Sequence, residues 1–237
     1  MIEIKNLIKK YGNKTVLDNI SLTINNGDIF AFVGHNGAGK TTTIKCMTDI
    51  IEFDSGDILY DGVSIKTKPL ECKKLMAYIP DNPDLYEFLT GADYLNFYAD
   101  IYEMKDERTK EIDKYSEAFE LKEFLANPIS SYSHGMKQKL ALISALIHHP
   151  KYLILDEPFV GLDPIASHLL KEYMAELTKE GTSIFFSTHI LEVAEKLCNK
   201  VAIIKNGKLI KSGLMKDVLK DQSLEDIFLE LENEKSA

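Results

Sequence analysis

The sequence predicts an α/β fold, an open sheet with helices, interrupted by a helical insertion. Two observations carry this prediction. Short apolar runs at 29–33 and 152–155 each end in a polar loop, as buried parallel strands do. Between about 85 and 149, apolar residues recur at helical spacing instead. A core of sheet and helices therefore surrounds an inserted helical lobe.

The bulk composition narrows the classes of function. The chain has 237 residues and a net charge of −9, and an acidic chain does not offer the broad basic face of a nucleic-acid-binding protein. We therefore expect no nucleic-acid partner. No apolar signal segment opens the chain, and no uncharged apolar run reaches the roughly 18 residues that span a bilayer. Any membrane role is expected to come through a partner protein.

The cysteines carry no signal of a disulfide framework or a zinc site. Cys46, Cys72 and Cys198 are the three cysteines of the chain, and none forms a CxxC pair. This usage fits a reducing compartment. We expect all three to be small buried hydrophobic residues.

The first 28 residues predict an antiparallel unit. Apolar residues alternate over 2–8 and again over 16–24, and a turn-like segment at 25–28 suggests a hairpin. Tyr11 lies at a turn before the next strand, where an exposed ring can stack on a purine base with Val16 against its edge. The alternative is a partly exposed surface tyrosine.

The segment 34–42 has the phosphate-binding P-loop pattern. It follows the apolar strand at 29–33 and precedes the start of a helix at 43–47. Its glycines let backbone N–H groups curl around phosphates, and the helix N-terminus adds partial positive charge. Lys40 would neutralise the β- and γ-phosphates, and Thr41 would place its hydroxyl on Mg²⁺. A glycine-rich turn that binds nothing is the alternative. The predicted nucleotide-binding residues here are Gly34, His35, Asn36, Gly37, Ala38, Gly39, Lys40, Thr41 and Thr42.

The middle of the chain contains two short strands, at 58–60 and 75–79, and then a Pro-rich boundary loop at 80–83. Helices follow. Thr90 and Asp93 form a predicted N-cap pair, and the stripe of aromatic and aliphatic residues that comes next is expected to pack in the core. A solvated amphipathic helix is expected over 105–123. The residues of the stripe are Tyr94, Leu95, Phe97, Tyr98, Ile101 and Tyr102.

Two acidic residues follow the apolar strand at 152–155. Asp156 lies at the carboxyl end of that strand, where open α/β sheets bind ligands, and suits a partner for the Mg²⁺ ion on Thr41. Glu157 is placed to deprotonate an attacking water. A helix-capping Asp-Glu pair is the alternative. The remaining expected elements are helices at about 164–179 and 190–198, a strand at 183–189, a hairpin at 201–210 with an Asn-Gly turn, and an amphipathic tail helix after 214.

Together these residues resemble the ATP-binding subunit of ABC transporters over essentially the whole chain. The diagnostic segment is 131–138, Ser-Tyr-Ser-His-Gly-Met-Lys-Gln, at the position of the family signature Leu-Ser-Gly-Gly-Gln. The P-loop, this segment, the Asp-Glu pair and a later strand ending in His189 are together highly specific. The resemblance implies a P-loop NTPase with a RecA-like core, an N-terminal antiparallel β-subdomain and an inserted α-helical subdomain.

The resemblance also implies roles for single residues. Tyr11 matches the aromatic residue that stacks on adenine, Asp156 the Mg²⁺-associated carboxylate, and Glu157 the catalytic base. His189 matches the switch histidine at the γ-phosphate, and it joins Glu157 and Lys40 as a predicted catalytic residue. Ser133 and the backbone N–H of Gly135 would contact the γ-phosphate held by an opposite cassette, so the implied unit is a head-to-tail dimer with ATP between the subunits.

Four positions depart from the family pattern. His134 stands where the signature has Gly, and Met136 where it has Gln. Asp81 stands where the family has Gln in the loop that joins the core to the helical lobe. It remains a predicted metal ligand beside Thr41 and Asp156, but the added charge puts the switching mechanism in doubt. Gly161, in the loop that communicates across the dimer, replaces a residue that is often Ala.

The resulting prediction is a Mg²⁺-dependent ATPase that binds ATP and serves an ABC transporter. The 131–138 segment and the tail resemble those of bacterial exporters of the multidrug and antibiotic type, whose transmembrane permease subunits are encoded separately. We expect a cytoplasmic protein held at the inner face of the membrane by its permease. A soluble or regulatory ABC ATPase with weak or no hydrolysis is the alternative. Predicted domains are the first part of the core at 1–84, the helical subdomain at 85–149, the second part of the core at 150–213 and the tail at 214–237.

Overall fold

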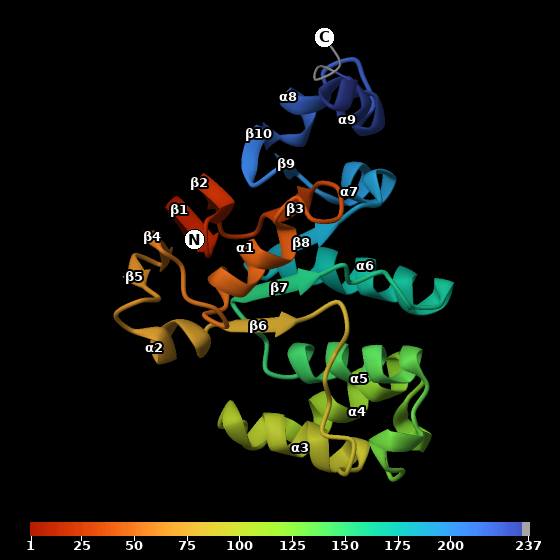
Figure 1. Ribbon diagram of the computed structural model, residues 1–237. Coiled ribbons are helices and arrows are strands. Elements are labelled where there is room, and N and C mark those ends of the chain that lie inside the picture. The colour runs from red at the N-terminus through yellow and green to blue at the C-terminus, as the bar shows by residue number, and fades with distance from the viewer. Residues whose placement is uncertain (234–237) are drawn as a thin grey trace.

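The computed structural model describes residues 1–233, with side chains to residue 231, and builds them around two sheets (Figure 1). The smaller sheet is antiparallel, with strand order β2-β1-β4-β5. The larger sheet has the order β10-β9-β3-β8-β7-β6 and is parallel except for β10. The strands are β1 (Ile2–Tyr11), β2 (Lys14–Ile24), β3 (Ile29–Val33), β4 (Ser55–Tyr60), β5 (Val63–Ser64), β6 (Met76–Ile79), β7 (Tyr152–Asp156), β8 (Ser183–Thr188), β9 (Lys200–Lys205) and β10 (Lys208–Leu214).

The helices lie around and beyond the parallel sheet (Figure 1). Beyond the edge strand β6, three of them form the helical lobe. The helices are α1 (Lys40–Met47), α2 (Pro69–Lys73), α3 (Gly91–Ile101), α4 (Arg108–Ala118), α5 (His134–Leu146), α6 (Pro164–Lys179), α7 (Leu191–Leu197), α8 (Met215–Leu219) and α9 (Leu224–Asn233), with short 3-10 turns η1 (Lys122–Phe124) and η2 (Ile129–Ser131). None of the helices described over residues 1–233 has the length and apolarity needed to cross a bilayer.

Each central strand of the parallel sheet is buried on both faces, and each face belongs to a different hydrophobic core. Side chains alternate across a strand, so in β3 Ala31 and Val33 join the core that contains the helical lobe and α6. Phe30 and Phe32 join the core under the antiparallel sheet and α1. The strands are therefore apolar throughout, as buried parallel strands are, and the predicted α/β fold is confirmed.

One predicted hairpin is wrong. The segment 25–28 links β2 to β3, but these strands belong to different sheets and do not pair. The turn instead carries the chain from one sheet to the other. It is fixed by Asp28, whose carboxylate accepts hydrogen bonds from the backbone N–H of Asn25 at 2.6 Å and from Asn199 at 2.8 Å. The predicted β9–β10 hairpin is confirmed, with Asn206 and Gly207 at positive φ.

The helical lobe confirms some local predictions and corrects others. Thr90 is the N-cap of α3 and accepts a hydrogen bond from the backbone N–H of Asp93. The amphipathic helix expected over 105–123 is shorter, because α4 ends at Ala118. The aromatic stripe of α3 is only partly core, since Phe97 and Ile101 are exposed. These two lie on the outer side of a helix at the surface of the lobe, so no second layer covers them.

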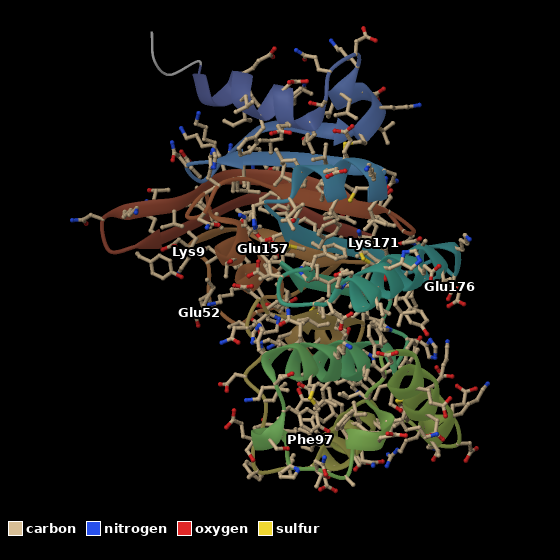
Figure 2. The ribbon with its side chains drawn as sticks, turned by 90° about the vertical axis from the view of Figure 1, so that its right-hand side faces the viewer. Lys9, Glu52, Phe97, Glu157, Lys171 and Glu176 are labelled. Atoms are coloured by element: carbon tan, nitrogen blue, oxygen red, sulfur yellow. The ribbon has the colours of Figure 1, made fainter. Side chains whose placement is uncertain are left out.

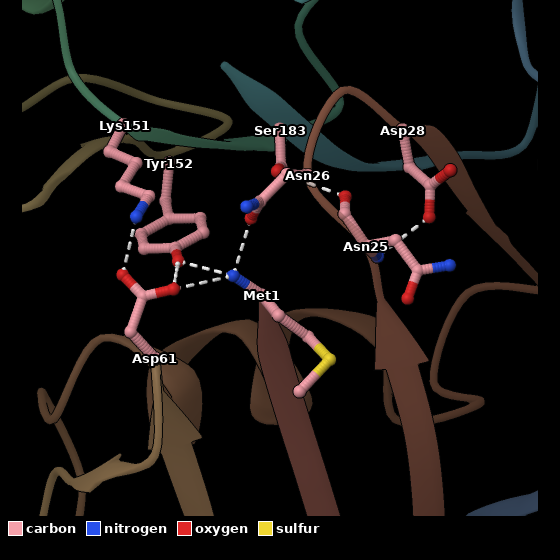
Figure 3. Close-up of polar contacts among 8 residues, drawn as sticks. All are labelled: Met1, Asn25, Asn26, Asp28, Asp61, Lys151, Tyr152 and Ser183. Atoms are coloured by element: carbon pink, nitrogen blue, oxygen red, sulfur yellow. Dashed lines mark hydrogen bonds and ion pairs between the residues drawn. The ribbon is translucent and has the colours of Figure 1, made fainter. Parts of the chain in front are cut away.

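A polar network ties the two sheets together at the amino ends of the parallel strands (Figure 3). Asp61, in the β4–β5 turn, binds the Lys151 ammonium at 2.7 Å and accepts a hydrogen bond from the Tyr152 hydroxyl at 2.7 Å. The Met1 ammonium contacts the same carboxylate at 2.8 Å. Partial burial raises the pKa of Asp61, but the hydrogen bonds from Lys151, the Met1 ammonium and Tyr152 outweigh it and bring the pKa well below its usual range.

The three cysteines are unpaired and buried, as predicted. Cys46 lies in α1, Cys72 in α2, and Cys198 just after α7. Burial raises the pKa of the Cys46 thiol to about 12, and burial also raises the pKa of the Cys72 and Cys198 thiols. All three are therefore protonated near neutral pH and chemically inert in the folded protein.

The tail folds back onto the core through two helices rather than one. Leu224 and Ile227 of α9 are buried in the core that contains α7. The carboxylate of Glu195 in α7 accepts a hydrogen bond from the backbone N–H of Leu224 at 2.8 Å. Residues 234–237 of the predicted tail lie outside the described part of the chain.

Candidate active site

The P-loop connects β3 to α1, as the sequence predicts. Two of its glycines allow close backbone contact. A methyl group at Gly34 would lie 2.5 Å from the backbone oxygen of Ile204 in β9, and one at Gly39 would lie 2.8 Å from Leu17. Gly39 also has a φ of +113°, a conformation that favours glycine. The loop therefore fits between the two sheets only with glycine at these positions.

Lys40, the first residue of α1, turns its side chain back into the loop. Its ammonium donates hydrogen bonds to the backbone oxygens of Gly34 at 2.7 Å and His35 at 3.4 Å. It also lies 3.4 Å from a carboxylate oxygen of Glu157, and both side chains are mostly buried. Positive charge is thus held at the centre of an anion-binding loop.

Asp156 ends β7 with a carboxylate that is half satisfied. One oxygen, Oδ1, accepts a hydrogen bond from the Ser187 hydroxyl of the neighbouring strand β8. The other, Oδ2, has no partner among the described residues, although Asp156 is 1% exposed. A buried carboxylate oxygen without a partner is costly, so this atom marks a place for a cation.

Glu157 follows in an unusual backbone conformation. Its φ is +50°, which costs energy for a residue with a β-carbon. Its N–H donates hydrogen bonds to the backbone oxygen and the hydroxyl of Ser187, at 3.2 and 3.1 Å. Its carboxylate oxygen Oε2 lies 2.9 Å from Nδ1 of His189 and accepts a hydrogen bond from the His189 backbone N–H at 3.3 Å. The structure therefore brings together the three predicted catalytic residues, Lys40, Glu157 and His189.

A cavity of about 270 Å³ lies against this cluster. Asp81, in the loop after β6, contributes a third acidic side chain to the area. Burial raises the pKa of Asp81, and the negative charges of Asp156 and Glu157 raise it further. The lining residues are Val16, His35, Asn36, Gly37, Gly39, Lys40, Thr41, Thr42, Asp81 and Glu157.

The residues present fit a magnesium ion that is completed by a bound nucleotide. The described residues contain no group of three His, Cys, Asp or Glu side chains that could hold a metal alone. Magnesium in such sites takes one or two protein oxygens and the rest from substrate phosphates and water. Two protein oxygens are available for the ion: Oδ2 of Asp156, which has no described partner, and the hydroxyl of Thr41, an exposed residue.

Tyr11 and Val16 are placed differently from one another. Val16 lines the cavity with the P-loop. Tyr11 does not line it. It ends β1 and is 52% exposed, and the Lys9 ammonium lies 4.8 Å from the centre of its ring. In Figure 2 Lys9 and Glu157 lie on the same side of the molecule. The ring is thus partly open to solvent at the end of β1.

Ser133 and Gly135 are not brought to the P-loop of the same chain. Ser133 is the N-cap of α5, and its hydroxyl accepts a hydrogen bond from the backbone N–H of Met136 at 3.3 Å. Neither residue lines the cavity. In Figure 1 α5 lies in the helical lobe, below the strand that precedes Glu157. These two predicted ligands serve a phosphate only if it is brought to them from outside the chain.

Two functional contacts are absent from the sequence predictions. Ser187 orients both Asp156 and Glu157, and its only signal is a hydroxyl two residues before His189 in an apolar strand. The tail helix α9 is the other. The rings of Phe228 and His35 meet edge to face with centres 4.6 Å apart, so the tail contacts the P-loop. They line a second cavity of about 280 Å³ with His189 and Leu191.

Comparison with known proteins shows the family of the chain. The family described as "ABC transporter" matches residues 17–160. The uncharacterized ABC transporter ATP-binding protein YhcH of Bacillus subtilis is 37% identical, over 92% of this chain and 71% of that protein. The linearmycin resistance ATP-binding protein LnrL of the same organism is 33% identical, over 92% of this chain and 70% of that protein.

Solved structures show the same fold. A structure described as the ATP binding subunit of an ABC transporter superposes with a TM-score of 0.94 at 34% identity, covering 98% of this chain and 99% of that one. A dimeric, post-hydrolysis ATP-binding cassette, MJ0796 bound to ADP and Pi, superposes with a TM-score of 0.83 at 20% identity, covering 91% and 99%. The order of the strands and the inserted helical lobe are thus those of known ATP-binding cassettes.

Proposed function

Because this chain belongs to the ABC transporter family as an ATP-binding ATPase subunit, we propose that it drives export through a separate membrane subunit. In this proposal two cassettes close on ATP and reopen after hydrolysis. The single observation that carries the catalytic part is the contact of Glu157 with both Lys40 and His189 at the mouth of the P-loop. Antibiotic export is supported by the likeness to LnrL, whose name assigns it to linearmycin resistance.

The proposal gives each of these side chains a chemical role. Lys40 and the N-terminus of α1 bind the β- and γ-phosphates, and Tyr11 stacks on the adenine with Val16 beside it. Glu157 takes a proton from the attacking water as general base, and His189 orients Glu157 and the γ-phosphate. Thr41, Asp156 and Asp81 would hold Mg²⁺, which neutralises charge on the phosphate oxygens when bound.

The second cassette completes the site. Ser133 and Gly135 begin α5 and lie away from the P-loop of their own chain. The start of α5 adds the partial positive charge of a helix N-terminus to the Ser133 hydroxyl. In a head-to-tail dimer, identical or mixed, these donors meet the γ-phosphate on the opposite P-loop. The MJ0796 cassette, which is dimeric with ADP and Pi bound, supports dimer formation by this fold.

The membrane subunit docks between the core and the helical lobe, which places the protein at the inner face of the membrane. A cavity of about 280 Å³ opens there between the segment after α1, the end of α2, β6, α3 and α5. The neighbouring surface of the lobe carries exposed aromatic rings: Phe88 is 82% exposed, and Tyr86 stands between Phe88 and Phe97 with ring centres 6.0 and 5.8 Å apart. Figure 2 shows Phe97 at the end of the lobe far from Glu157. Exposed apolar patches of this kind mark interaction sites.

Steady-state ATPase of the purified chain tests the proposal, with Glu157→Gln as the active-site variant. Loss of a general base costs about 10²- to 10⁴-fold, so the variant should be nearly silent and should form a stable dimer on gel filtration in Mg-ATP. The control is Glu192→Gln, the same change at an exposed carboxylate that pairs with Lys196, and it should turn over normally. A silent wild type that also stays monomeric in ATP would contradict the homodimer and require a different cassette or the membrane subunit.

A further inference from the structure

The loop over residues 157–163 runs from the proposed general base to the start of α6. It begins at Glu157 with a tight turn, because the backbone N–H of Val160 donates a hydrogen bond to the backbone oxygen of Glu157 at 3.1 Å. It ends at Asp163, the N-cap of α6, whose carboxylate accepts a hydrogen bond from the backbone N–H of Ala166 at 2.8 Å. A shift of this loop therefore acts directly on the backbone that carries the base.

The first turn of α5 packs against the middle of the 157–163 loop. Gly161 has a φ of +82°, and a methyl group there would lie 2.9 Å from both Cδ2 and Nε2 of His134. The reverse side is close as well, because a methyl group at Gly135 would lie 3.3 Å from the backbone oxygen of Gly161. The imidazole thus occupies the space that a larger residue at position 161 would need.

The second turn of α5 holds the end of the same loop. The Lys139 ammonium lies 2.8 Å from Oδ2 of Asp163, and the lysine side chain is only 13% exposed. Between these contacts lies Gln138, which is 1% exposed and whose amide has no hydrogen-bond partner within the part of the chain that the structure describes. Around Gly161 the loop is therefore held by the shape of the His134 ring, with the amide of Gln138 adding no hydrogen bond.

From these contacts we infer that His134 is a positioning residue for hydrolysis: its ring, seated on Gly161, transmits the position of α5 to Glu157 in the same chain. The inference rests on the proposed role of Glu157 as general base. At the start of α5, Ser133 and Gly135 would then face the phosphate of the opposite cassette. His134, between them, would contact the 157–163 loop of its own chain. Movement of the helical lobe would reach the base through the contact of this ring with Gly161, beside the ion pair of Lys139 with Asp163.

Three variants of the full chain test the inference. Gly161→Ala pushes a methyl group into the ring, and we expect kcat to fall by about 10- to 100-fold, as for a misplaced catalytic group, with KM within about twofold of wild type. Gly161→Ala combined with His134→Ala removes the ring that is struck, and most of kcat should return. Gly62→Ala is the matched control. Gly62 has a φ of +81° and no described atom within 4 Å of an added methyl group, so it reports backbone strain alone and should leave kcat unchanged.

Thermal unfolding without nucleotide separates the possible failures. If the contact is as described, Gly161→Ala should lower the Tm more than Gly62→Ala does, and the added His134→Ala should recover the difference. Recovery of the Tm without recovery of kcat would overturn the inference and leave the role of Glu157 intact. A normal kcat for Gly161→Ala would also overturn it. If Glu157→Gln hydrolyses ATP like the wild type, the proposed base itself fails and the inference fails with it.

Discussion

Replacing Asp156 with Asn should stabilise the nucleotide-free protein while it abolishes the proposed magnesium-dependent ATP hydrolysis. The carboxylate is buried, and its Oδ2 has no partner among the residues described. Leaving such a charged group unpaired costs about 1–3 kcal/mol or more, and the neutral amide that replaces it costs less. Repulsion from the nearby carboxylates of Asp81 and Glu157 adds to the cost. The same repulsion is seen at Asp81, whose pKa is raised by the negative charges of Asp156 and Glu157.

The gain is partly offset at the other oxygen. The Ser187 hydroxyl donates to Oδ1 of Asp156, and a hydrogen bond to a charged acceptor is stronger than one to a neutral amide by about 1 kcal/mol. The net expectation for Asp156→Asn is a gain of about 1 kcal/mol in the free energy of unfolding. For a chain of this length that corresponds to a Tm increase of about 2–4 °C.

The assay is thermal unfolding by circular dichroism at pH 7 in EDTA, repeated with Mg-ATP. In EDTA the Asn variant should melt above wild type, and in Mg-ATP it should gain less than wild type because the cation has lost its ligand. Ser187→Ala is the control in the opposite direction, since it leaves both carboxylate oxygens of Asp156 without a partner and should lower the Tm. An Asn variant that melts below wild type in EDTA would refute the reasoning.

Two further predictions concern the ends of the sheets. Tyr11→Ala should weaken ATP binding by about 5- to 150-fold, because one aromatic–base stack contributes about 1–3 kcal/mol. Tyr11→Phe keeps the ring and should bind ATP like the wild type. Calorimetric titration with ATP measures both affinities, and an Ala variant that binds as tightly as the wild type would exclude stacking. Asp61→Asn should destabilise the protein by about 0.5–1 kcal/mol at neutral pH. Because the pKa of Asp61 is lower in the folded protein, its contribution is full above the unfolded pKa of about 4 and is lost as the pH falls below it. The difference in urea midpoint between wild type and variant should therefore be full at pH 7 and shrink progressively as the pH falls from about 5 toward 1, and a difference that grows on acidification would contradict this sign.

The sequence predicts best those features that depend on neighbours along the chain. The P-loop, the strand ending in Asp156 and the Asn-Gly hairpin at 206–207 are local patterns with a local physical cause, and the structure has each of them. The segment 25–28 shows the limit, because a turn looks alike whether its strands pair or separate into two sheets. In the structure this turn is held by contacts from far along the chain, such as the hydrogen bond from Asn199 to Asp28.

The same limit applies to the site. Asp156 and Glu157 are recognisable from the strand they follow, but the residue that orients both, Ser187, lies in another strand and is an ordinary hydroxyl in sequence. The exposed Phe97 shows the limit at the surface, since helical spacing alone does not say whether a further layer will cover a helix. Contacts between distant elements, such as Phe228 with His35, emerge only from the assembled fold.

The three buried thiols can report local unfolding in three separate regions of the protein. Cys46 sits in the helix that begins at the P-loop, Cys72 beside the antiparallel sheet, and Cys198 just after α7. Each is protected by burial and by its raised pKa, so a thiol reagent labels it only when its own part of the molecule opens. The rate at which each cysteine is labelled therefore reports the stability of one region without any introduced probe. Because we propose that ATP binds at the P-loop, bound ATP should slow the labelling of Cys46 more than that of Cys72 or Cys198.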